Sequence, residues 1–438
     1  MVELILACDS RGGIGFQNKI PWKIKDDLNL FKIKTMDSEL ICGSKTFESL
    51  PALEGRRVYK LSKKEGLTIE KVLTQININN KTIFVIGGAE IYKEFLENYS
   101  HLIKKIHVSL INDNDDYECD TFVDYFKILA EYKYLQEESQ KFKDFIYQVF
   151  VPETPSGELQ YLTLLRNVIN NQDNTFEGRN GLVFRDVVNH LKFDLSDNNF
   201  PLITTKRMFF RGIVEELLFF LRGDTNTKIL EEKGINIWRG NTCKEFQEKT
   251  GLNYPEGEMG PMYGYQWRYF NKDFTTKDTS SYIDQLSEVI HQIKNEPSSR
   301  RILLTDYNPL QAKQGVLYPC HSIIIQFFVE GDYLDMFCYN RSSDLFLGLP
   351  FNIASSSLLL LVIAKITGKT ARFFNLSLGD CHVYEQHKEA VLEQLTRIPY
   401  RLPTIKIKDF EKIEDLTFEH FTLENYKFHP PIKAEMIA

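Results

Sequence analysis

The chain has 438 residues and a formal net charge of −7 at pH 7. A chain of this length exceeds one ordinary hydrophobic core, so it predicts two domains of roughly 150 and 280 residues. The negative net charge argues against a nucleic-acid partner, because a nucleic-acid-binding surface needs clustered positive charge.

Cysteine spacing and hydropathy favour a cytoplasmic protein. The seven cysteines are scattered without a paired spacing, which predicts reduced thiols, and no CxxC or HExxH pattern predicts a metal site. The N-terminus has no signal-peptide pattern. The longest apolar helical stretch, 358–364, is far too short to cross a membrane and predicts a core helix. We therefore expect neither a metal nor a membrane partner.

Strand-like and helical patterns alternate through the first third of the chain. Apolar runs that predict strands lie at 2–7, 39–42, 57–61, 82–86 and 106–111. Because helical patterns separate several of them, we expect a mostly parallel sheet covered by helices. Alternating apolar positions in the last part of this region, 132–151, predict a closing hairpin.

Two local features of this region are candidates for chemistry. Asp27 begins an amphipathic segment five residues after Trp22, although an acid in a first helical turn is also favoured by the helix dipole and by capping. Gly87-Gly88 stands between an apolar strand and a helical pattern. A pair of glycines lets the backbone approach a phosphate at a helix N-terminus, and a simple turn is the alternative.

A short stretch with two prolines separates two parts of different character. Residues 152–156 read Pro-Glu-Thr-Pro-Ser, and proline stiffens so short a connection. We predict one domain at 1–151, a linker at 152–156 and a second domain at 157–438.

The second part contains a thiol in unusual company. Cys320 alone would predict a small buried hydrophobe. A guanidinium such as that of Arg341 favours the thiolate and lowers a thiol pKa, which makes Cys320 a candidate nucleophile. Glu216 lies within an apolar run, where an acid is either paired with an arginine or functional. The amide of Asn352 offers both a donor and an acceptor to a base, and helix capping is its alternative role.

From about residue 157 to 438 the chain resembles thymidylate synthase. The matching stretches, in chain order, are FPLITTKR (200–207), VEELL (214–218), GPMYGYQWR (260–268), SRR (299–301), LYPCH (317–321), GLPFN (348–352) and LGDCHVY (378–384). The resemblance implies that Cys320 adds to C6 of dUMP, so that C5 attacks 5,10-methylenetetrahydrofolate. The products would be dTMP and dihydrofolate.

The same resemblance implies roles for individual residues. Glu216 would organise water, Tyr263 would help the C5 proton leave, and Asn352 would read the uracil, favouring dUMP over dCMP. The implied dUMP-binding residues are Arg179, Arg300, Arg301, Arg341, Ser342, Asn352, His382 and Tyr384. The implied folate-binding residues are Trp238, Asn241, Asp344, Gly348, Phe351 and the C-terminal Ala438. Arg300 and Arg301 would come from the other subunit, which implies a homodimer.

The match to thymidylate synthase has three departures. Asn340 stands where glutamine is usual, which shortens a contact by one methylene, and Arg239 stands where an acid is common. The phosphate loop is about two residues shorter than usual. We choose Arg179 for its arginine, with Arg185 as the rival.

Residues 1–151 resemble dihydrofolate reductase. The resemblance rests on Ile14-Gly15, Pro21-Trp22, Asp27-Leu28, Phe31-Lys32, Gly43 with Thr46, Gly55-Arg56 and the run 85–88. It implies that Asp27 bonds the pterin and supports its protonation, and that Arg56 holds the carboxylate of the folate tail. Arg57 is expected to be a solvated surface charge.

The reductase resemblance also implies two binding sites. The implied folate-binding residues are Ala7, Asp27, Phe31 and Arg56. The implied NADPH-binding residues are Ile14, Gly15, Lys45, Thr46, Ser62, Lys63, Gly87, Gly88, Ala89 and Glu90. Ser44 replaces a basic residue of many relatives and Ser109 replaces a threonine, so preference for NADPH would depend on Lys45, Ser62 and Lys63.

The whole chain therefore resembles a bifunctional dihydrofolate reductase–thymidylate synthase. The implied fold is an α/β reductase domain with a mostly parallel twisted sheet and flanking helices, followed by an α+β synthase domain that dimerises. The alternatives are a synthase-like domain acting on dCMP, or a non-catalytic RNA-binding or scaffold protein. Retention of Cys320, Arg300, Arg301, Arg341 and Asp27 favours the enzyme.

Overall fold

The computed structural model describes residues 2–62, 64–76, 82–112, 117–152, 157–171, 174–178, 180–275 and 281–437. The chain divides into two compact units: a first unit, Met1–Leu159 with Leu395–Arg401, and a second unit, Gln160–Gln394 with Leu402–Ala438. Residues 153–156 of the predicted linker lie outside the described residues. The first helix after the linker, α6, spans Gly157–Asn170.

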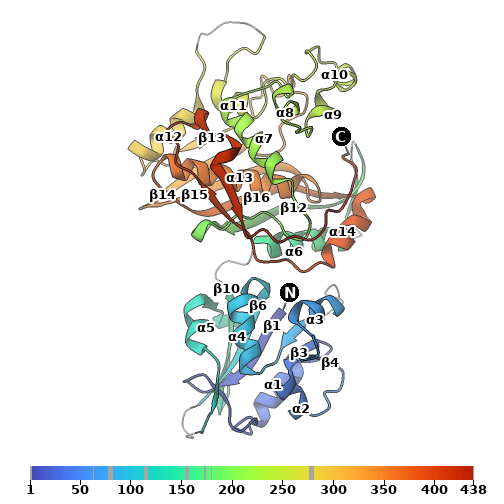
Figure 1. The fold of residues 1–438 in the computed structure, drawn as a ribbon, viewed down its shortest axis with the longest axis vertical. Coiled ribbons are helices and arrows are strands. Elements are labelled where there is room, and N and C mark those ends of the chain that lie inside the picture. The colour runs from blue at the N-terminus through green and yellow to red at the C-terminus, as the bar shows by residue number, and fades with distance from the viewer. Residues whose placement is uncertain are drawn as a thin grey trace. The chain divides into compact units, whose positions relative to one another are not determined.

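The first unit is built on one mixed sheet (Figure 1). In spatial order its strands are β4 (Arg57–Leu61), β3 (Glu39–Gly43), β5 (Ile83–Val85), β1 (Val2–Cys8), β6 (Ile103–Ile111), β10 (Phe145–Pro152) and β8 (Tyr132–Tyr134), with β9 (Gln140–Lys141) beside β10. The strands from β4 to β6 run parallel to one another, and β10 is antiparallel to both β6 and β8. The predicted hairpin segment thus contributes three strands, β8, β9 and β10, of which β10 is inserted between β6 and β8.

Helices and short elements connect these strands. The helices are α1 (Lys25–Thr35), α2 (Ser44–Ser49), α3 (Ile69–Gln75), α4 (Ala89–Asn98) and α5 (Tyr125–Glu131), with the 3-10 turns η1 (Ser100–Leu102) and η2 (Gln136–Glu138). A small antiparallel pair, β2 (Gly13–Gly15) with β7 (Thr121–Phe122), was not predicted from the sequence. Its strands are too short to show an apolar period, so pairing between distant segments defines them.

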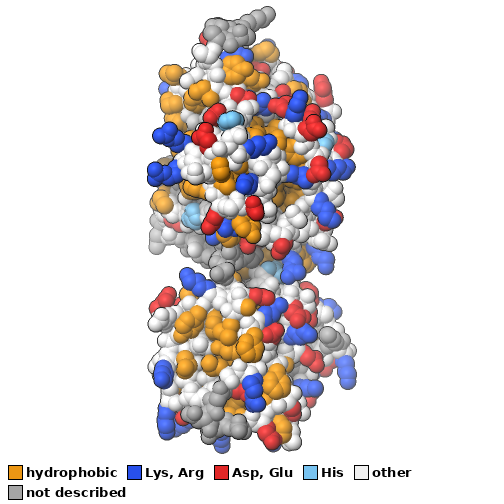
Figure 2. Space-filling model, turned by 90° about the vertical axis from the view of Figure 1, so that its left-hand side faces the viewer, with side chains coloured by type: hydrophobic (Ala, Val, Ile, Leu, Met, Phe, Trp, Pro, Cys, Tyr) orange, Lys and Arg blue, Asp and Glu red, His pale blue; other side chains and the backbone are white. Residues whose placement is uncertain are grey.

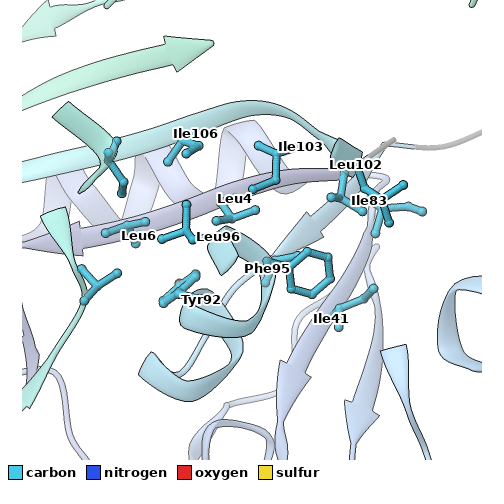
Figure 3. Close-up of a cluster of buried hydrophobic side chains, with 14 of the residues drawn as sticks. Leu4, Leu6, Ile41, Ile83, Tyr92, Phe95, Leu96, Leu102, Ile103 and Ile106 are labelled. Atoms are coloured by element: carbon cyan, nitrogen blue, oxygen red, sulfur yellow. The ribbon is translucent and has the colours of Figure 1, made fainter. Parts of the chain in front are cut away.

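The first unit's core forms where α4 meets the sheet. Tyr92, Phe95 and Leu96 are buried, and their spacing of three and four residues places them on one helix face. Figure 3 shows these side chains beside core residues of the strands, among them Leu4 and Ile83. Fully burying each such side chain stabilises the fold by about 1.5–3 kcal/mol. The Tyr92 hydroxyl also donates a 2.7 Å hydrogen bond to the Ile5 carbonyl. This bond fixes the position of α4 relative to β1.

The second unit has its own mixed sheet. In spatial order its strands are β11 (Thr175–Gly178), β12 (Gly181–Asp194), β16 (Thr370–Tyr384), β15 (Tyr333–Asp344), β14 (Ile324–Glu330) and β13 (Leu303–Leu304). Only the β15–β16 pair is parallel in this sheet as described. A separate hairpin joins β17 (Thr404–Ile407) to β18 (Phe421–Glu424).

Helices of the second unit cover this sheet and carry the site segments. They are α6, α7 (Phe210–Arg222), α8 (Lys228–Glu231), α9 (Arg239–Thr242), α10 (Lys244–Thr250), α11 (Gly264–Tyr269), α12 (Gln285–Asn295), α13 (Gly348–Ile366) and α14 (Lys388–Leu395). The 3-10 turns are η3 (Ser196–Asn198), η4 (Glu385–His387), η5 (Ile413–Asp415) and η6 (Phe418–His420).

Helix α13 is longer than the apolar stretch 358–364 predicted from the sequence. The apolar stretch 358–364 is part of a helix of 19 residues, which by length and composition alone is enough to cross a membrane. Within its most apolar window, however, 67% of the residues are buried inside the protein, and the helix packs on β15 and β16 (Figure 1). Burial on this scale is typical of the core helix that the sequence predicts, although the predicted length was wrong.

The protein surface mixes charges of both signs. Figure 2 shows Lys and Arg side chains interspersed with Asp and Glu on the face drawn, with hydrophobic side chains gathered on part of the first unit. On that unit, Phe126, Leu129 and Tyr134 of α5 and β8 are among the exposed hydrophobic side chains.

Candidate active sites

Asp27 lies in the first turn of α1, half-buried against the sheet. Burial raises the pKa of Asp27, and a hydrogen bond from the Ser109 hydroxyl acts to lower it. Ser109 lies on β6 directly opposite Ala7 of β1, so the sheet holds the hydroxyl beside the acid. The N-cap residue of α1 is Ile24, and no side chain caps this helix. Helix capping therefore does not account for an acid at position 27.

One face of α1 connects Asp27 to Arg56. Asp27, Phe31 and Thr35 follow one another at intervals of four residues and share that face. The Arg56 guanidinium donates a 3.1 Å hydrogen bond to the Thr35 hydroxyl and lies 5.8 Å from the Phe31 ring centre. Arg57 is exposed, as predicted, and lies over the Tyr59 ring. The sheet and one helix thus position both an acid and a fork-shaped donor for a carboxylate.

Gly87 and Gly88 lie between the N-termini of helices α2 and α4. Gly87 has a φ of 116° and accepts a 2.9 Å hydrogen bond from the Gly43 backbone, and the Gly87-Gly88 peptide is cis. Gly88 is the N-cap residue of α4. A Cβ at Gly88 would lie 3.3 Å from the Thr46 hydroxyl of α2. The pair therefore leaves backbone open at a helix N-terminus, which is the arrangement that binds a phosphate.

The other predicted NADPH residues are more dispersed. Ile14 and Gly15 lie on β2, Ala89 and the exposed Glu90 begin α4, and Lys45 is exposed on α2. The buried Ser62 follows β4, and its hydroxyl accepts a 3.3 Å hydrogen bond from the Glu65 backbone. Ser44 donates to the Leu61 carbonyl at 3.0 Å, so it anchors α2 to the end of β4. Lys63 lies outside the described residues.

Cys320 precedes β14 in the second unit. Its carbonyl accepts a 2.8 Å hydrogen bond from the Arg341 backbone, and the Arg341 side chain donates to the Pro319 carbonyl at 3.1 Å. The Cys320 sulfur lies 3.6 Å from the Tyr263 hydroxyl. Burial raises the pKa of the Cys320 thiol, although the Tyr263 hydrogen bond and the Arg341 charge both act to lower it. The guanidinium acts on this pKa in the expected direction, but desolvation of the thiolate outweighs it.

Tyr263, whose hydroxyl lies next to the Cys320 sulfur, is surrounded by other aromatic rings. The Tyr263 ring stacks on His321 with centres 4.3 Å apart and lies 5.2 Å from the Phe220 ring and 5.9 Å from Trp238. Its backbone has a φ of 43° at the start of α11. Burial raises the pKa of Tyr263 well above its usual value and lowers the pKa of His321 to about 4. Both groups are therefore neutral at pH 7.

Adjacent glutamates of α7 have different environments. Glu215 forms a 2.6 Å ion pair with Lys233. Glu216 instead accepts a 2.7 Å hydrogen bond from the Trp238 indole. Burial raises the pKa of Glu216 to about 7, while the indole hydrogen bond acts to lower it. Within the described part of the chain no arginine pairs with Glu216, whose partner is the Trp238 indole.

A pair of strands orients His382. The His382 Nδ1 atom lies 2.8 Å from an Asp380 oxygen, and Arg185 of β12 binds the other oxygen of the same carboxylate. Tyr384 follows on β16. Because Arg185 is engaged by Asp380 and stacks over Phe176, it is poorly placed to serve as the phosphate arginine. The preferred candidate, Arg179, lies outside the described residues.

The start of α13 carries three predicted residues. Asp344 accepts hydrogen bonds from the backbone of Phe346 and Leu347 at 2.9 and 3.2 Å, just before Gly348 begins the helix. Asn352 lies inside α13 and not at its N-cap, which is Leu347. The capping alternative for Asn352 is therefore wrong.

The remaining predicted residues are not all brought together. Ser342 of β15 donates its backbone N–H to the Cys320 carbonyl at 3.3 Å, and Asn241 is buried on α9. Phe351 is half-buried on α13. Arg300 and Arg301 are exposed, and among the described residues neither guanidinium has a hydrogen bond or ion pair. Ala438 lies outside the described residues, but the segment before it is anchored by His387, which bonds the Glu435 carbonyl at 2.8 Å.

Two buried polar residues lie near Cys320, of which the sequence pattern identified Asn340 as a departure and missed Asp306. Asp306 follows β13 and is 1% exposed, and neither carboxyl oxygen has a hydrogen-bond partner among the described residues. Asn340 of β15 accepts a 3.0 Å hydrogen bond from the Ser322 backbone through Oδ1, while its Nδ2 has no partner in the described part. An Asp before Tyr-Asn-Pro looks like a turn residue in sequence, so only burial identifies it. The described residues contain no group of three or more His, Cys, Asp or Glu placed to hold a metal ion.

Comparison with known proteins assigns both units. The dihydrofolate reductase family model matches residues 1–150, and the thymidylate synthase family model matches residues 159–438. The bifunctional dihydrofolate reductase-thymidylate synthase of Paramecium tetraurelia is 36% identical, covering 99% of this chain and 98% of that protein. Bifunctional dihydrofolate reductase-thymidylate synthase 2 of Arabidopsis thaliana is 34% identical (99% and 88%), and the Leishmania major protein is 32% identical (99% and 94%). The chain therefore belongs to the bifunctional dihydrofolate reductase–thymidylate synthase family and joins both enzymes in one polypeptide.

Proposed function

We propose that the chain methylates dUMP with 5,10-methylenetetrahydrofolate, and then reduces the resulting dihydrofolate to tetrahydrofolate with NADPH. The observation that carries this proposal is the placement of Cys320 within 3.6 Å of Tyr263 and beside Arg341 in the second unit. The first unit adds Asp27 on α1 and Arg56, whose guanidinium is bonded to Thr35 on the same face of that helix. A nucleophile with an anion-binding arginine and a separate acid with a carboxylate clamp fit the two half-reactions.

In the reductase unit, Asp27 holds the pterin and supports its protonation. Its raised pKa keeps a proton on the acid to a higher pH than usual, as a proton donor requires. Arg56, fixed by Thr35 and Phe31, receives the tail carboxylate. NADPH supplies the hydride when bound. The open backbone at Gly87 and Gly88 fits its pyrophosphate, because a side chain at Gly88 would crowd Thr46.

In the synthase unit, Cys320 forms a bond to C6 of dUMP and C5 then bonds the methylene carbon of the folate. Loss of the C5 proton breaks the bond between the methylene carbon and the folate nitrogen. Hydride transfer from the folate to that carbon completes the methyl group and leaves dihydrofolate, while the C6–S bond breaks to release the Cys320 thiolate and dTMP. Tyr263 lies next to the sulfur and is neutral, so it relays the C5 proton through its hydroxyl. Glu216, whose pKa is about 7, exchanges protons readily at neutral pH and organises water near the base.

The nucleotide is held by residues from several strands. Arg341 and Ser342 of β15 receive the phosphate, with Arg179 as a further ligand. His382, oriented by Asp380, binds the deoxyribose hydroxyl with Tyr384. Asn352 reads the uracil through both its donor and its acceptor. This amide favours dUMP over dCMP.

We further propose that the active species is a homodimer through the synthase unit, in which Arg300 and Arg301 bind dUMP of the other subunit. Both guanidinium groups are exposed and have no partner in the described part of this chain. On β14, Ile324 and Phe328 are 42% and 45% exposed and alternate with the buried Ile325 and Phe327. An exposed apolar sheet face of this kind is typical of a subunit interface.

The location and domain limits are part of the same proposal. All seven cysteines are free, which fits a reducing compartment, and we place the protein in the cytoplasm. The reductase domain ends near residue 151 and the synthase domain begins near 157. Subcellular fractionation and limited proteolysis at 152–156 test the two statements.

The decisive assay follows NADPH oxidation by the purified chain given dUMP and methylenetetrahydrofolate, without added dihydrofolate. We expect oxidation that requires dUMP, because only the synthase reaction supplies the reductase substrate. A reaction lacking dUMP is the control, and replacing dUMP with dCMP tests the alternative substrate. Oxidation that is equally fast without dUMP, or faster with dCMP, contradicts the proposal.

Subunit complementation tests the homodimer. Cys320→Ser and Arg301→Ala variants are expected to be inactive in dTMP formation when separate. Mixed under conditions that exchange subunits, they form dimers in which one site has both an intact Cys320 and an intact Arg301, so activity returns. Continued inactivity of a mixture shown to contain mixed dimers would contradict the sharing of arginines.

A further inference from the structure

Asp306 lies between two residues that hold the segment around Cys320. The Thr305 hydroxyl donates to the Ile323 carbonyl, and the Tyr307 and Tyr318 hydroxyls are 2.6 Å apart. The chain on each side of Asp306 is thus attached to the chain on each side of Cys320. Asp306 therefore lies next to the segment that carries Cys320.

The Asp306 carboxyl is enclosed and unsatisfied. It is 1% exposed, and among the described residues neither oxygen accepts a hydrogen bond from a neighbouring side chain or backbone group. A buried carboxylate without donors is strongly unfavourable, so such a group holds its proton. Burial accordingly raises the pKa of Asp306 well above its usual range.

The Asp306 charge acts on titratable groups from three segments. They are Tyr263 at the start of α11, Cys320 before β14, and Cys338 on β15, and the Asp306 charge raises the pKa of each. Arg341 on β15 acts on Cys320 in the opposite direction. The neighbouring His321 is neutral, since burial lowers its pKa to about 4. Cys320 therefore experiences one acid and one guanidinium, and only the acid can lose its charge.

We propose that Asp306 is a positioning residue for the synthase reaction, which shares one negative charge with Cys320, so that the thiol becomes a thiolate only while Asp306 keeps its proton. The proposal rests on the proposed synthase function and deepens it. Loss of a proton from either group opposes loss from the other, because both would place like charges in one enclosed space. Asp306 therefore opposes thiolate formation in the free enzyme over the pH range in which Asp306 itself loses its proton.

Alkylation of Cys320 by iodoacetamide across a pH series measures this coupling without any substrate. Peptide mass spectrometry separates Cys320 from Cys119 and Cys243, which are also partly accessible. In Asp306→Asn the pH at which Cys320 alkylation reaches half its maximal rate, the midpoint of the profile, is expected to fall by about one unit or more. Below the midpoint the alkylation rate is then about tenfold higher than in the wild type. Asp332→Asn, which removes an exposed acid of the same unit, is expected to leave the profile unchanged.

Coincident profiles for the wild type and a folded Asp306→Asn variant would overturn the proposal. An infrared pH titration covers the case in which that variant does not fold. It compares Glu216→Gln with Glu216→Gln/Cys320→Ser, so that a second acid of raised pKa near the site is absent from both. The protonated carboxyl band of Asp306 is expected to disappear at lower pH when Cys320 is absent, and an unchanged titration would also overturn the proposal.

These measurements separate the role of Asp306 from the proposed function. Neither alkylation nor infrared titration requires dUMP or folate. A shifted alkylation profile supports the Asp306 proposal even if the wild type fails the dUMP-dependent assay, which overturns only the synthase assignment. Coincident profiles in a chain that passes the assay overturn only the Asp306 proposal.

Discussion

Asp27 of the reductase unit and Glu216 of the synthase unit are both partly buried acids of raised pKa, but their surroundings and hydrogen-bond donors differ. Asp27 lies half-buried in the first turn of α1, with the Ser109 hydroxyl as its donor. Glu216 lies among the apolar residues of α7, where the Trp238 indole is its donor and its pKa rises to about 7. Asp306 completes the series, with no donor among the described residues. The comparison teaches that desolvation sets the direction of each shift and that each available donor offsets part of it.

The two sites also differ in how many segments they need. A single face of α1 carries Asp27, Phe31 and the anchor of Arg56. The synthase site draws Glu216, Tyr263 and Cys320 from segments separated by about 50 residues each. Because the two sites lie in separate units, a change in one unit should leave the chemistry of the other intact. The following variants test that independence or its physical basis.

The largest effect is expected for Cys320→Ser. Removal of the nucleophile should lower dTMP formation by more than about 10³-fold, because the serine hydroxyl is a far weaker nucleophile than a thiolate. Reduction of added dihydrofolate, measured by NADPH oxidation, should remain at the wild-type rate. A parallel loss of both activities would show that the units are not independent.

Asp27→Asn should produce the reverse pattern. Loss of the proton donor should lower dihydrofolate reduction by about 10²–10³-fold at neutral pH, while dTMP formation is unchanged. Asp26→Asn, which alters an exposed acid of the same helical turn, is the matched control and should retain reductase activity. Equal losses in the two variants would argue against a specific role for Asp27.

Glu216→Gln should change stability in a pH-dependent way. The pKa of Glu216 rises from 4.5 to about 7 in the folded protein, so the stability that its proton confers is fully present below about pH 4.5 and is lost as pH rises through 7. The variant escapes this loss, and its free energy of unfolding should exceed that of the wild type by about 1–3 kcal/mol at pH 8. At pH 4.5 the two should be similar.

Chemical denaturation of the synthase unit at pH 4.5 and pH 8 checks this difference. Glu215→Gln is the contrasting variant, because it breaks the ion pair with Lys233 and should destabilise the protein at pH 8. The same sign for both variants at pH 8 would rule out the desolvation argument for Glu216.

The smallest effect is expected for Ser109→Ala. Loss of the hydroxyl removes the group that lowers the pKa of Asp27, so the pKa should rise further. Because the protonated acid is the active form, the fall in dihydrofolate reduction with rising pH should move upward by about 0.5–1 pH unit. Ser109→Thr keeps the hydroxyl and should keep the wild-type pH profile. An unshifted profile in Ser109→Ala would mean that another donor takes over.

Elements with local signals could be predicted from the amino-acid sequence. Strands such as β1, β3 and β6 were predicted because a few consecutive apolar residues suffice to mark a buried strand. The nucleophile and the acid of α1 were identified through motifs that lie in short contiguous stretches. Both family matches agree with those motifs.

The charge states and the partners of the site residues depend on the folded chain. Arg341 lowers the pKa of Cys320 as expected, but burial by distant segments outweighs it. The pairing of Arg185 with Asp380, the indole bound to Glu216, and the enclosure of Asp306 each join residues far apart in the chain. Desolvation is a sum over everything that surrounds a group in space, and residues adjacent in sequence provide only a small part of those surroundings.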